Sequence, residues 1–207
     1  CRLTHLVVSV WSILKMSNVT TTRDNNVDMR GVTRIKMIIE NQSDIFSDED
    51  VAKIIELGDA LAHVEGLIIG DKVDHRVRDA KIAWVHPNAD TWWIFDKAIK
   101  VFKSGLPFST LQSMQYTVYY KGGHYDWHRD LGDGDAIMKA RVNAAILQLS
   151  DPSEYKGGVL QIKTKDKEVI DVMKKKGMVT SFPVDTLHKV TPVISGIRKT
   201  LIMWGLK

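Results

Sequence analysis

The sequence predicts an α+β protein, mainly β, with supporting helices in its N-terminal half and a sandwich or jelly-roll barrel in its C-terminal half. Apolar residues recur at helical spacing before Pro107, and they alternate with polar residues after it. Short apolar segments then follow one another, separated by glycine and proline, as in a sandwich or barrel. There is no internal repeat or long linker. We therefore expect one domain at 31–207, with its β-rich core at about 110–207.

The N-terminal residues 1–30 are expected to form an extension and a linker. The apolar run Leu6–Leu14 is too short to cross a membrane, which takes about 20 residues. It suits a segment that packs on the core, or residues upstream of a natural start at Met16, better than an export signal. Residues 17–30 are polar and rich in threonine and asparagine, which indicates a loop. A strand is predicted within Gly31–Glu40.

Two helices are predicted next. Ser47 is a candidate N-cap followed by three acidic residues, which suit the positive end of a helix dipole, so we expect a helix at about 48–63. A second helix should begin at Asp90 or Thr91 and end before Pro107. Its apolar face would comprise Trp93, Ile94, Ala98, Val101 and Phe102.

The strands are predicted from alternation and from their glycine and proline boundaries. The first spans about 111–120, where alternate residues are apolar. Residues 71–90 and 131–140 are predicted loops that would select the substrate. Trp84, Trp92 and Trp93 could line a groove or fill the core, and the core is favoured for at least one of the last two. The further predicted strands are Arg141–Leu149, Gly158–Thr164, Glu168–Met173, Met178–Phe182, His188–Val193 and Arg198–Trp204.

Composition limits the kinds of site that the chain can build. Its 207 residues are enough for a sizeable core, and the net charge of +4 permits nucleic acid as a partner without requiring it. Cys1 is the only cysteine, so one chain can form neither a disulfide nor a cysteine-based zinc site. A metal must be held by histidine and carboxylate. These features predict a cytoplasmic protein with no membrane partner.

The residues that carry chemistry are His128, Asp130, His188 and Arg198. Residues two apart on a strand share a face, so His128 and Asp130 would point the same way, and a barrel could bring His188 beside them. Two histidines and one carboxylate leave open positions on Fe(II) for a 2-oxo acid and O2. Arg198 could grip the acid's far carboxylate. Alone, the His-x-Asp pair also fits a surface hydrogen bond, and Arg198 also fits a surface salt bridge.

Several motifs in order give the sequence a family resemblance over about 110–207. The sequence resembles the 2-oxoglutarate and Fe(II)-dependent dioxygenases of the prolyl 4-hydroxylase type, and especially the PKHD-type hydroxylases. Their fold is a double-stranded β-helix, or jelly roll. The motifs are Tyr119-x-x-Gly122-x-x-Tyr125-x-x-His128-x-Asp130, Arg141 before VNAAILQLSDP, Glu154-Tyr155-Lys156-Gly157-Gly158-Val159-Leu160, and His188-x-x-Thr191-Pro192-Val193-x-x-Gly196-x-Arg198 with Trp204.

The resemblance implies a role for each matched residue. His128, Asp130 and His188 would ligate iron, and Arg198 and Tyr119 would bind 2-oxoglutarate. Tyr125 and Arg141 would be catalytic, with Arg141 and Trp204 on the substrate side. Core packing is the alternative for Tyr125 and Trp204. Tyr120 should face away from Tyr119 and be structural, and four histidines without a matched role are expected on loops or the surface: His63, His75, His86 and His124.

The expected reaction is hydroxylation of a prolyl residue in a peptide or protein, coupled to decarboxylation of 2-oxoglutarate to succinate. Fe(II), 2-oxoglutarate and O2 would be required, with ascorbate as a further candidate cofactor. One alternative is an AlkB-like nucleic-acid demethylase, and another is a non-catalytic jelly-roll module that binds metal. The family often has an acidic residue where Val159 stands, a departure that leaves the metal site intact. The lysine-rich residues 163–176 are predicted to form a solvated hairpin.

Overall fold

The computed structural model describes residues 39–68, 72–102, 107–131 and 136–207. The predicted extension 1–30, the run Leu6–Leu14 and all but the end of the predicted strand Gly31–Glu40 lie outside the described residues. At that end, the short strand β1 covers Glu40–Gln42. No helix in the described ranges is long and apolar enough to span a membrane.

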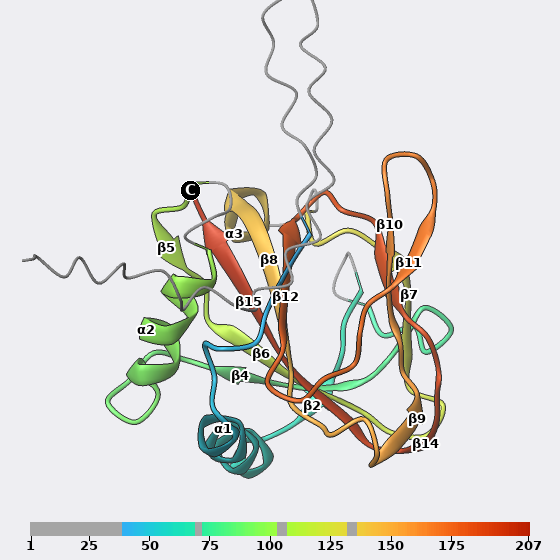
Figure 1. Ribbon diagram of the computed structural model, residues 1–207, viewed down its shortest axis with the longest axis horizontal. Coiled ribbons are helices and arrows are strands. Elements are labelled where there is room, and N and C mark those ends of the chain that lie inside the picture. Colours follow the sequence, from blue (N-terminus) through green and yellow to red (C-terminus); the bar gives the residue numbers. More distant parts are fainter. Residues whose placement is uncertain (1–38, 69–71, 103–106, 132–135) are drawn as a thin grey trace, which may run out of the picture.

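Two antiparallel sheets form the body of the molecule (Figure 1). The larger sheet, which we call the major sheet, has eight strands, in the order β1, β12 (Val179–Pro183), β8 (Arg141–Gln148), β15 (Arg198–Leu206), β6 (Met114–Tyr119), β4 (Lys81–Val85) and β2 (Val64–Glu65), with β5 (Thr110–Leu111) paired to β15. The second sheet has the order β11 (Val169–Asp171), β10 (Leu160–Lys163), β13 (His188–Val190), β7 (His124–His128) and β3 (Arg78–Asp79). The strands β9 (Tyr155–Gly157) and β14 (Val193–Gly196) pair separately.

The helices α1 (Asp48–Ala60) and α2 (Trp92–Val101) lie on the side of the major sheet away from the second sheet (Figure 1). Both predicted helices are confirmed, although α1 ends at Ala60 rather than at about residue 63. This arrangement of supporting helices and two facing sheets confirms the predicted jelly-roll class.

Alternation along the central strands divides the buried residues into two clusters. The helix-side core lies between the major sheet and the helices, and it includes Tyr116, Leu147, Leu201 and Met203. The barrel-side core lies between the two sheets, and it includes Tyr119, Ile146, Phe182 and Trp204. Neighbouring residues of one strand thus serve different cores, because successive side chains point to opposite faces.

Local sequence explains how α1 seats on the sheet. The Ser47 hydroxyl accepts a hydrogen bond from the Asp50 amide, and the Asp50 carboxylate accepts one from the Ser47 amide, which forms a capping box. Gly58 lies directly over the ring of Tyr116, where a Cβ atom would stand 2.4 Å from a ring carbon. A residue without a side chain is therefore needed for this close approach.

The helix α2 follows Thr91, as predicted, and turns Ile94, Phe95, Ala98 and Val101 into the helix-side core. Trp93 packs against that core, but Trp92 is 62% exposed. The prediction that at least one of these two tryptophans fills the core is therefore confirmed, by Trp93. Lys97 of α2 pairs with Asp50 and joins the two helices.

Some predicted boundaries were wrong. The predicted loop 71–90 contains the strands β3 and β4, and the predicted loop 131–140 contains a short helix, α3 (Ala136–Ala140). The predicted strand His188–Val193 is two strands, since β13 ends at Val190 and β14 begins at Val193. The lysine-rich stretch does form the hairpin β10–β11, where Ile162 pairs with Ile170.

Candidate metal centre and adjoining cavities

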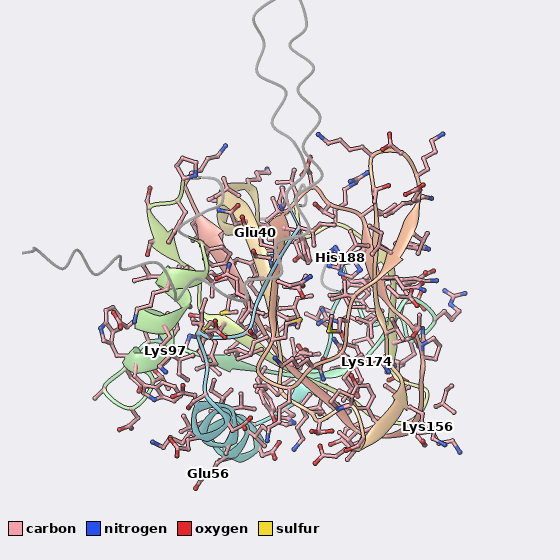
Figure 2. All side chains as sticks on the ribbon, viewed as in Figure 1. Glu40, Glu56, Lys97, Lys156, Lys174 and His188 are labelled. Atoms are coloured by element: carbon pink, nitrogen blue, oxygen red, sulfur yellow. The ribbon has the colours of Figure 1, made fainter. Side chains whose placement is uncertain are left out.

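Three side chains of the candidate metal centre converge between the two sheets. His128 and His188 are direct register partners on β7 and β13, with ring centroids 4.2 Å apart. Figure 2 shows His188 between the sheets. Asp130 lies two residues beyond the end of β7, so the prediction that it shares a strand face with His128 was wrong. The chain instead bends there, and the Asp130 amide donates to the Val184 carbonyl at 3.0 Å.

The bend still brings the Asp130 carboxylate to both imidazoles. Its Oδ1 atom lies 3.8 Å from Nε2 of His128 and 3.9 Å from Nε2 of His188. One ligand atom from each residue lies within 4.8 Å of the other two. Pairing between neighbouring strands thus joins two histidines that are 60 residues apart in the sequence (188 − 128).

Backbone carbonyls fix the orientation of both imidazole rings. Nδ1 of His128 lies 2.7 Å from the Asp126 carbonyl oxygen, and Nδ1 of His188 lies 2.9 Å from that of Thr186. A proton on each Nδ1 would be donated to these carbonyls, which leaves the Nε2 lone pair for a metal. Burial and the neighbouring His188 lower the pKa of His128 to about 3, so this ring is neutral at physiological pH.

Trp204 and Arg141 hold the Asp130 carboxylate in place. The indole Nε1 of Trp204 donates to Oδ2 of Asp130 at 2.9 Å, which leaves Oδ1 directed at the histidines. The Arg141 guanidinium stacks on the Trp204 ring at 3.9 Å and donates to the Asp130 carbonyl and to the Gln112 side chain. Burial opposes ionisation of Asp130, but the adjacent histidines and Trp204 outweigh it and lower the pKa of this carboxyl.

Tyr125 stands next to this centre. Its ring stacks on the His128 ring with centroids 3.4 Å apart and an angle of 13° between the planes. The guanidinium of Arg78 also lies over the Tyr125 ring, 4.6 Å from its centroid. Arg78 and Tyr125 are register partners on β3 and β7. Arg78 was missed by sequence reasoning, because it lies in a charged stretch that was interpreted as a loop.

A cavity of about 380 Å³ opens onto the metal centre. Tyr119, Tyr125, Arg141 and Trp204 line it together with the three candidate ligands, so the structure brings seven of the eight predicted site residues to one cavity. The other lining residues include the apolar side chains of Val64, Leu67, Ile68, Trp84 and Met138. Both segments that were predicted to select the substrate, 71–90 and 131–140, therefore contribute residues to the cavity wall.

Arg198 is the predicted site residue that does not line this cavity. It lines a second cavity of about 20 Å³, and Ile146 forms part of both walls. Arg198 pairs in register with Tyr119, and its guanidinium lies 5.4 Å from the Tyr119 ring centroid. It is 3% exposed, and its Nε has no hydrogen-bond partner among the described residues. A buried donor of this kind fits the carboxylate of an acidic ligand.

Two neighbours of Arg198, Tyr155 and Lys174, had no predicted role in the site. The Tyr155 hydroxyl is buried without a partner in the described part of the chain. Lys174 lies over the Tyr155 ring at 4.6 Å, and its ammonium group donates to the Gly157 carbonyl. Burial and the nearby Arg198 lower the pKa of Lys174. The prediction that the lysine-rich stretch is solvated was thus wrong at this position.

The four histidines without a predicted role stay outside the cavity. His75 and His86 are exposed and His63 lies in a loop, as expected, whereas His124 is a half-buried residue of β7. His75 also forms a second cluster with Glu65 and Asp79. Because Lys81 already pairs with Glu65, this cluster is an ion-pair network. Tyr120 is 49% exposed, whereas Tyr119 is 2% exposed, so the predicted opposite facing is correct.

Comparison with known proteins agrees with the geometry. Residues 114–205 match the family model described as the 2OG-Fe(II) oxygenase superfamily. A PKHD-type hydroxylase of Azoarcus sp. is 33% identical over 107 residues, which cover 50% of this chain and 46% of that protein. One of Synechococcus sp. is 41% identical over 83 residues, 40% of this chain and 36% of that protein. The matched region spans less than half the length of these relatives.

Solved structures share the fold over most of the chain. A prolyl hydroxylase of Trichoplax adhaerens, in complex with a hypoxia inducible factor peptide fragment, matches with a TM-score of 0.68 and 14% identity, covering 81% of this chain and 83% of that chain. A prolyl-4-hydroxylase of Pseudomonas putida matches with a TM-score of 0.65 and 20% identity, covering 82% and 92%. The predicted resemblance is confirmed, and the donor set of two imidazoles and one carboxylate is the one that such an oxygenase requires.

Proposed function

We propose that this chain, whose residues 114–205 match the 2OG-Fe(II) oxygenase superfamily, is a 2-oxoglutarate-dependent Fe(II) oxygenase that hydroxylates a prolyl residue of a peptide or protein. The observation that carries the proposal is the convergence of His128, His188 and Asp130. Their ligand atoms lie within 4.8 Å of one another on the wall of an open cavity, and both Nδ1 atoms are already engaged by backbone carbonyls.

Each residue then has a task. His128, His188 and Asp130 would hold Fe(II), which supplies activation of O2 when bound with 2-oxoglutarate. Trp204 keeps the Asp130 carboxylate directed at the metal position through its hydrogen bond, and the Arg141 guanidinium stacks on the Trp204 ring. Arg198 would pair with the far carboxylate of 2-oxoglutarate, and its neighbour Tyr119 would donate a hydroxyl to the same group.

The prolyl substrate is favoured by the relatives and by the cavity wall. The relatives are PKHD-type hydroxylases, and a structural neighbour is a prolyl hydroxylase with a bound peptide. The wall of the cavity includes Val64, Leu67 and Ile68, whose apolar side chains suit a pyrrolidine ring and the adjacent peptide. Tyr125 would face the substrate beside the metal, since its ring stacks on that of His128.

The oxygenase proposal is tested by cosubstrate turnover. Without O2, Fe(II) and 2-oxoglutarate should give a weak visible absorption band, and admission of air should yield succinate. His128→Ala should lose both signals, because it removes a ligand. His86→Ala is the matched control, since this exposed histidine lies outside the cavity. Absence of both signals in the wild type would refute the oxygenase function, and full retention in His128→Ala would refute the ligand assignment.

The substrate is tested separately by mass spectrometry. Proline-containing peptides and proteins of a bacterial lysate are incubated with the loaded enzyme, with and without 2-oxoglutarate. We expect a product heavier by one oxygen atom, on proline, only when 2-oxoglutarate is present. Oxygen on another residue type, or removal of a methyl group from nucleic acid in a parallel assay, would overturn the prolyl assignment while leaving the oxygenase class in place.

A further inference from the structure

Arg78 is a buried cation that has no counter-ion among the described residues. Its side chain belongs to β3 and lines the 380 Å³ cavity, and the residue is only 7% exposed. Its hydrogen bond within the described chain runs from Nη1 to the Leu67 carbonyl at 2.8 Å. Its Nε is buried without a partner in the same residues.

The position of Arg78 is fixed by its surroundings. The guanidinium is held over the Tyr125 ring, and Gly66 covers it closely, since a Cβ on Gly66 would stand 2.5 Å from Nε of Arg78. Tyr125 in turn stacks on His128. Arg78 therefore lies on the substrate side of the metal centre, whereas Arg198 lines the other cavity.

The charges that the described residues place around the cavity leave Arg78 unbalanced. Among those residues, the charged ones that line it are three arginines, at 78, 129 and 141, and one carboxylate, Asp130, which belongs to the metal centre. Arg141 is engaged by Gln112, Trp204 and the Asp130 carbonyl, and the exposed Arg129 donates to the Asp185 carbonyl. Iron and 2-oxoglutarate carry opposite charges of equal size, so they add no net negative charge for Arg78.

Burying a guanidinium without an anion beside it costs free energy, and such a guanidinium binds a carboxylate strongly. We propose that the substrate carries a carboxylate beside the residue that is oxidised. Arg78 would bind this carboxylate and so select acidic peptides. The inference rests on the proposed oxygenase function and adds the substrate class. The carboxylate comes from an acidic side chain next to the proline or from the carboxyl end of a peptide.

The test compares ligands that differ only in charge. N-acetyl-prolyl-glutamate amide is paired with its glutamine twin, and N-acetylproline with its amide. Each is titrated calorimetrically, without O2, into protein loaded with Fe(II) and 2-oxoglutarate. In at least one pair the carboxylate should bind about tenfold tighter than its neutral twin. The pair that shows the preference identifies the source of the carboxylate.

Variants assign the preference to Arg78. Arg78→Gln should abolish the difference within the pair while leaving the affinity for the neutral twin and for 2-oxoglutarate unchanged. Arg78→Lys should retain part of it, because the charge remains but the two-pronged geometry is lost. Thermal melting verifies that each variant is folded, and the comparison within pairs in the wild type needs no variant at all.

Three results would overturn the inference. The first is a wild type that prefers neither carboxylate. The second is an Arg78→Gln variant that binds both twins equally more weakly, as loss of a purely structural residue would cause, and the third is an Arg78→Gln variant whose affinity falls for 2-oxoglutarate instead. Succinate formation in air is measured on the same wild-type preparation. If the oxygenase proposal fails, succinate is absent, whereas failure of the Arg78 inference alone leaves succinate formation intact.

Discussion

The two faces of the major sheet are built from the same strands but have different chemistry. The helix-side face is closed by α1 and α2 and filled by fully buried side chains such as Met114, Leu147 and Leu201. The face toward the second sheet carries Tyr119, Arg198 and Trp204 beside two cavities. Buried donors without partners in the described chain, on Arg198 and Tyr155, also lie on the side toward the second sheet.

This difference separates stability from function within single strands. Burial of hydrocarbon stabilises the folded state, whereas cavities and unpaired buried donors cost free energy. Apolar side chains therefore fill the helix side, whereas the barrel side combines its own buried core with space for ligands. Changes to adjacent residues of β15 should consequently have different effects.

The largest expected effect is on the helix-side face. Leu201→Ala removes a fully buried side chain and should lower the free energy of unfolding by about 2–5 kcal/mol, from lost burial and the cavity that it leaves. Ile202→Ala is the matched control, because this neighbour faces the existing cavity and is only partly buried. Urea unfolding of both metal-free variants measures the difference. Equal losses in the free energy of unfolding for the two variants would contradict the proposed difference between the two faces of the sheet.

On the barrel side, Trp204→Phe should weaken metal binding more than folding. The variant keeps an aromatic ring but loses the hydrogen bond to Asp130, and loss of such a supporting bond typically costs about 10- to 100-fold in metal affinity. Titration with Fe(II) without O2 measures the affinity. Trp84→Phe serves as the control, since Trp84 lines the same cavity, 6.1 Å from Trp204. An unchanged affinity in Trp204→Phe would contradict the positioning role.

A smaller, graded effect is expected from pH. The pKa of His128 is about 3 in the folded protein and 6.5 in a model peptide. Between these two pH values the unfolded chain is protonated at His128, whereas the folded chain is not. The stability of the metal-free protein should fall as the pH drops below about 6.5 and continue falling toward 3, by up to about 1.4 kcal/mol per pH unit. Urea unfolding between pH 7.5 and 5.5 tests this. In His128→Gln, the slope of the free energy of unfolding against pH should be smaller by the contribution of one proton. A slope identical to that of the wild type would exclude His128 as the cause.

The sequence was sufficient for features that depend on local pattern. Ser47 and the acidic turn located α1, and the alternation in β6 separated Tyr119 from Tyr120. The spacing of the family motifs assembled His128, Asp130 and His188, although the reason for expecting Asp130 on a strand was wrong. The His-x-Asp motif thus predicted that the two side chains lie close together, although Asp130 lies beyond the strand that carries His128.

Features that depend on contacts between distant segments could not be predicted. Arg78 lies among charged residues, and only the pairing of β3 with β7 places it over Tyr125. The hydrogen bond from Trp204 to Asp130 joins residues 74 positions apart. Lys174 follows a run of alternating charges, yet the path of the chain after β11 brings it to Tyr155.

The hydrogen bond between Trp204 and Asp130 has a mechanical consequence. His128 and His188 belong to the second sheet, whereas Asp130 is tied to β15 of the major sheet through the indole. An ion held by all three would link the two sheets of the barrel, so the sheets could separate only after the ion is released. A free ion concentration of 100 times the dissociation constant would raise the free energy of unfolding by about 2.7 kcal/mol.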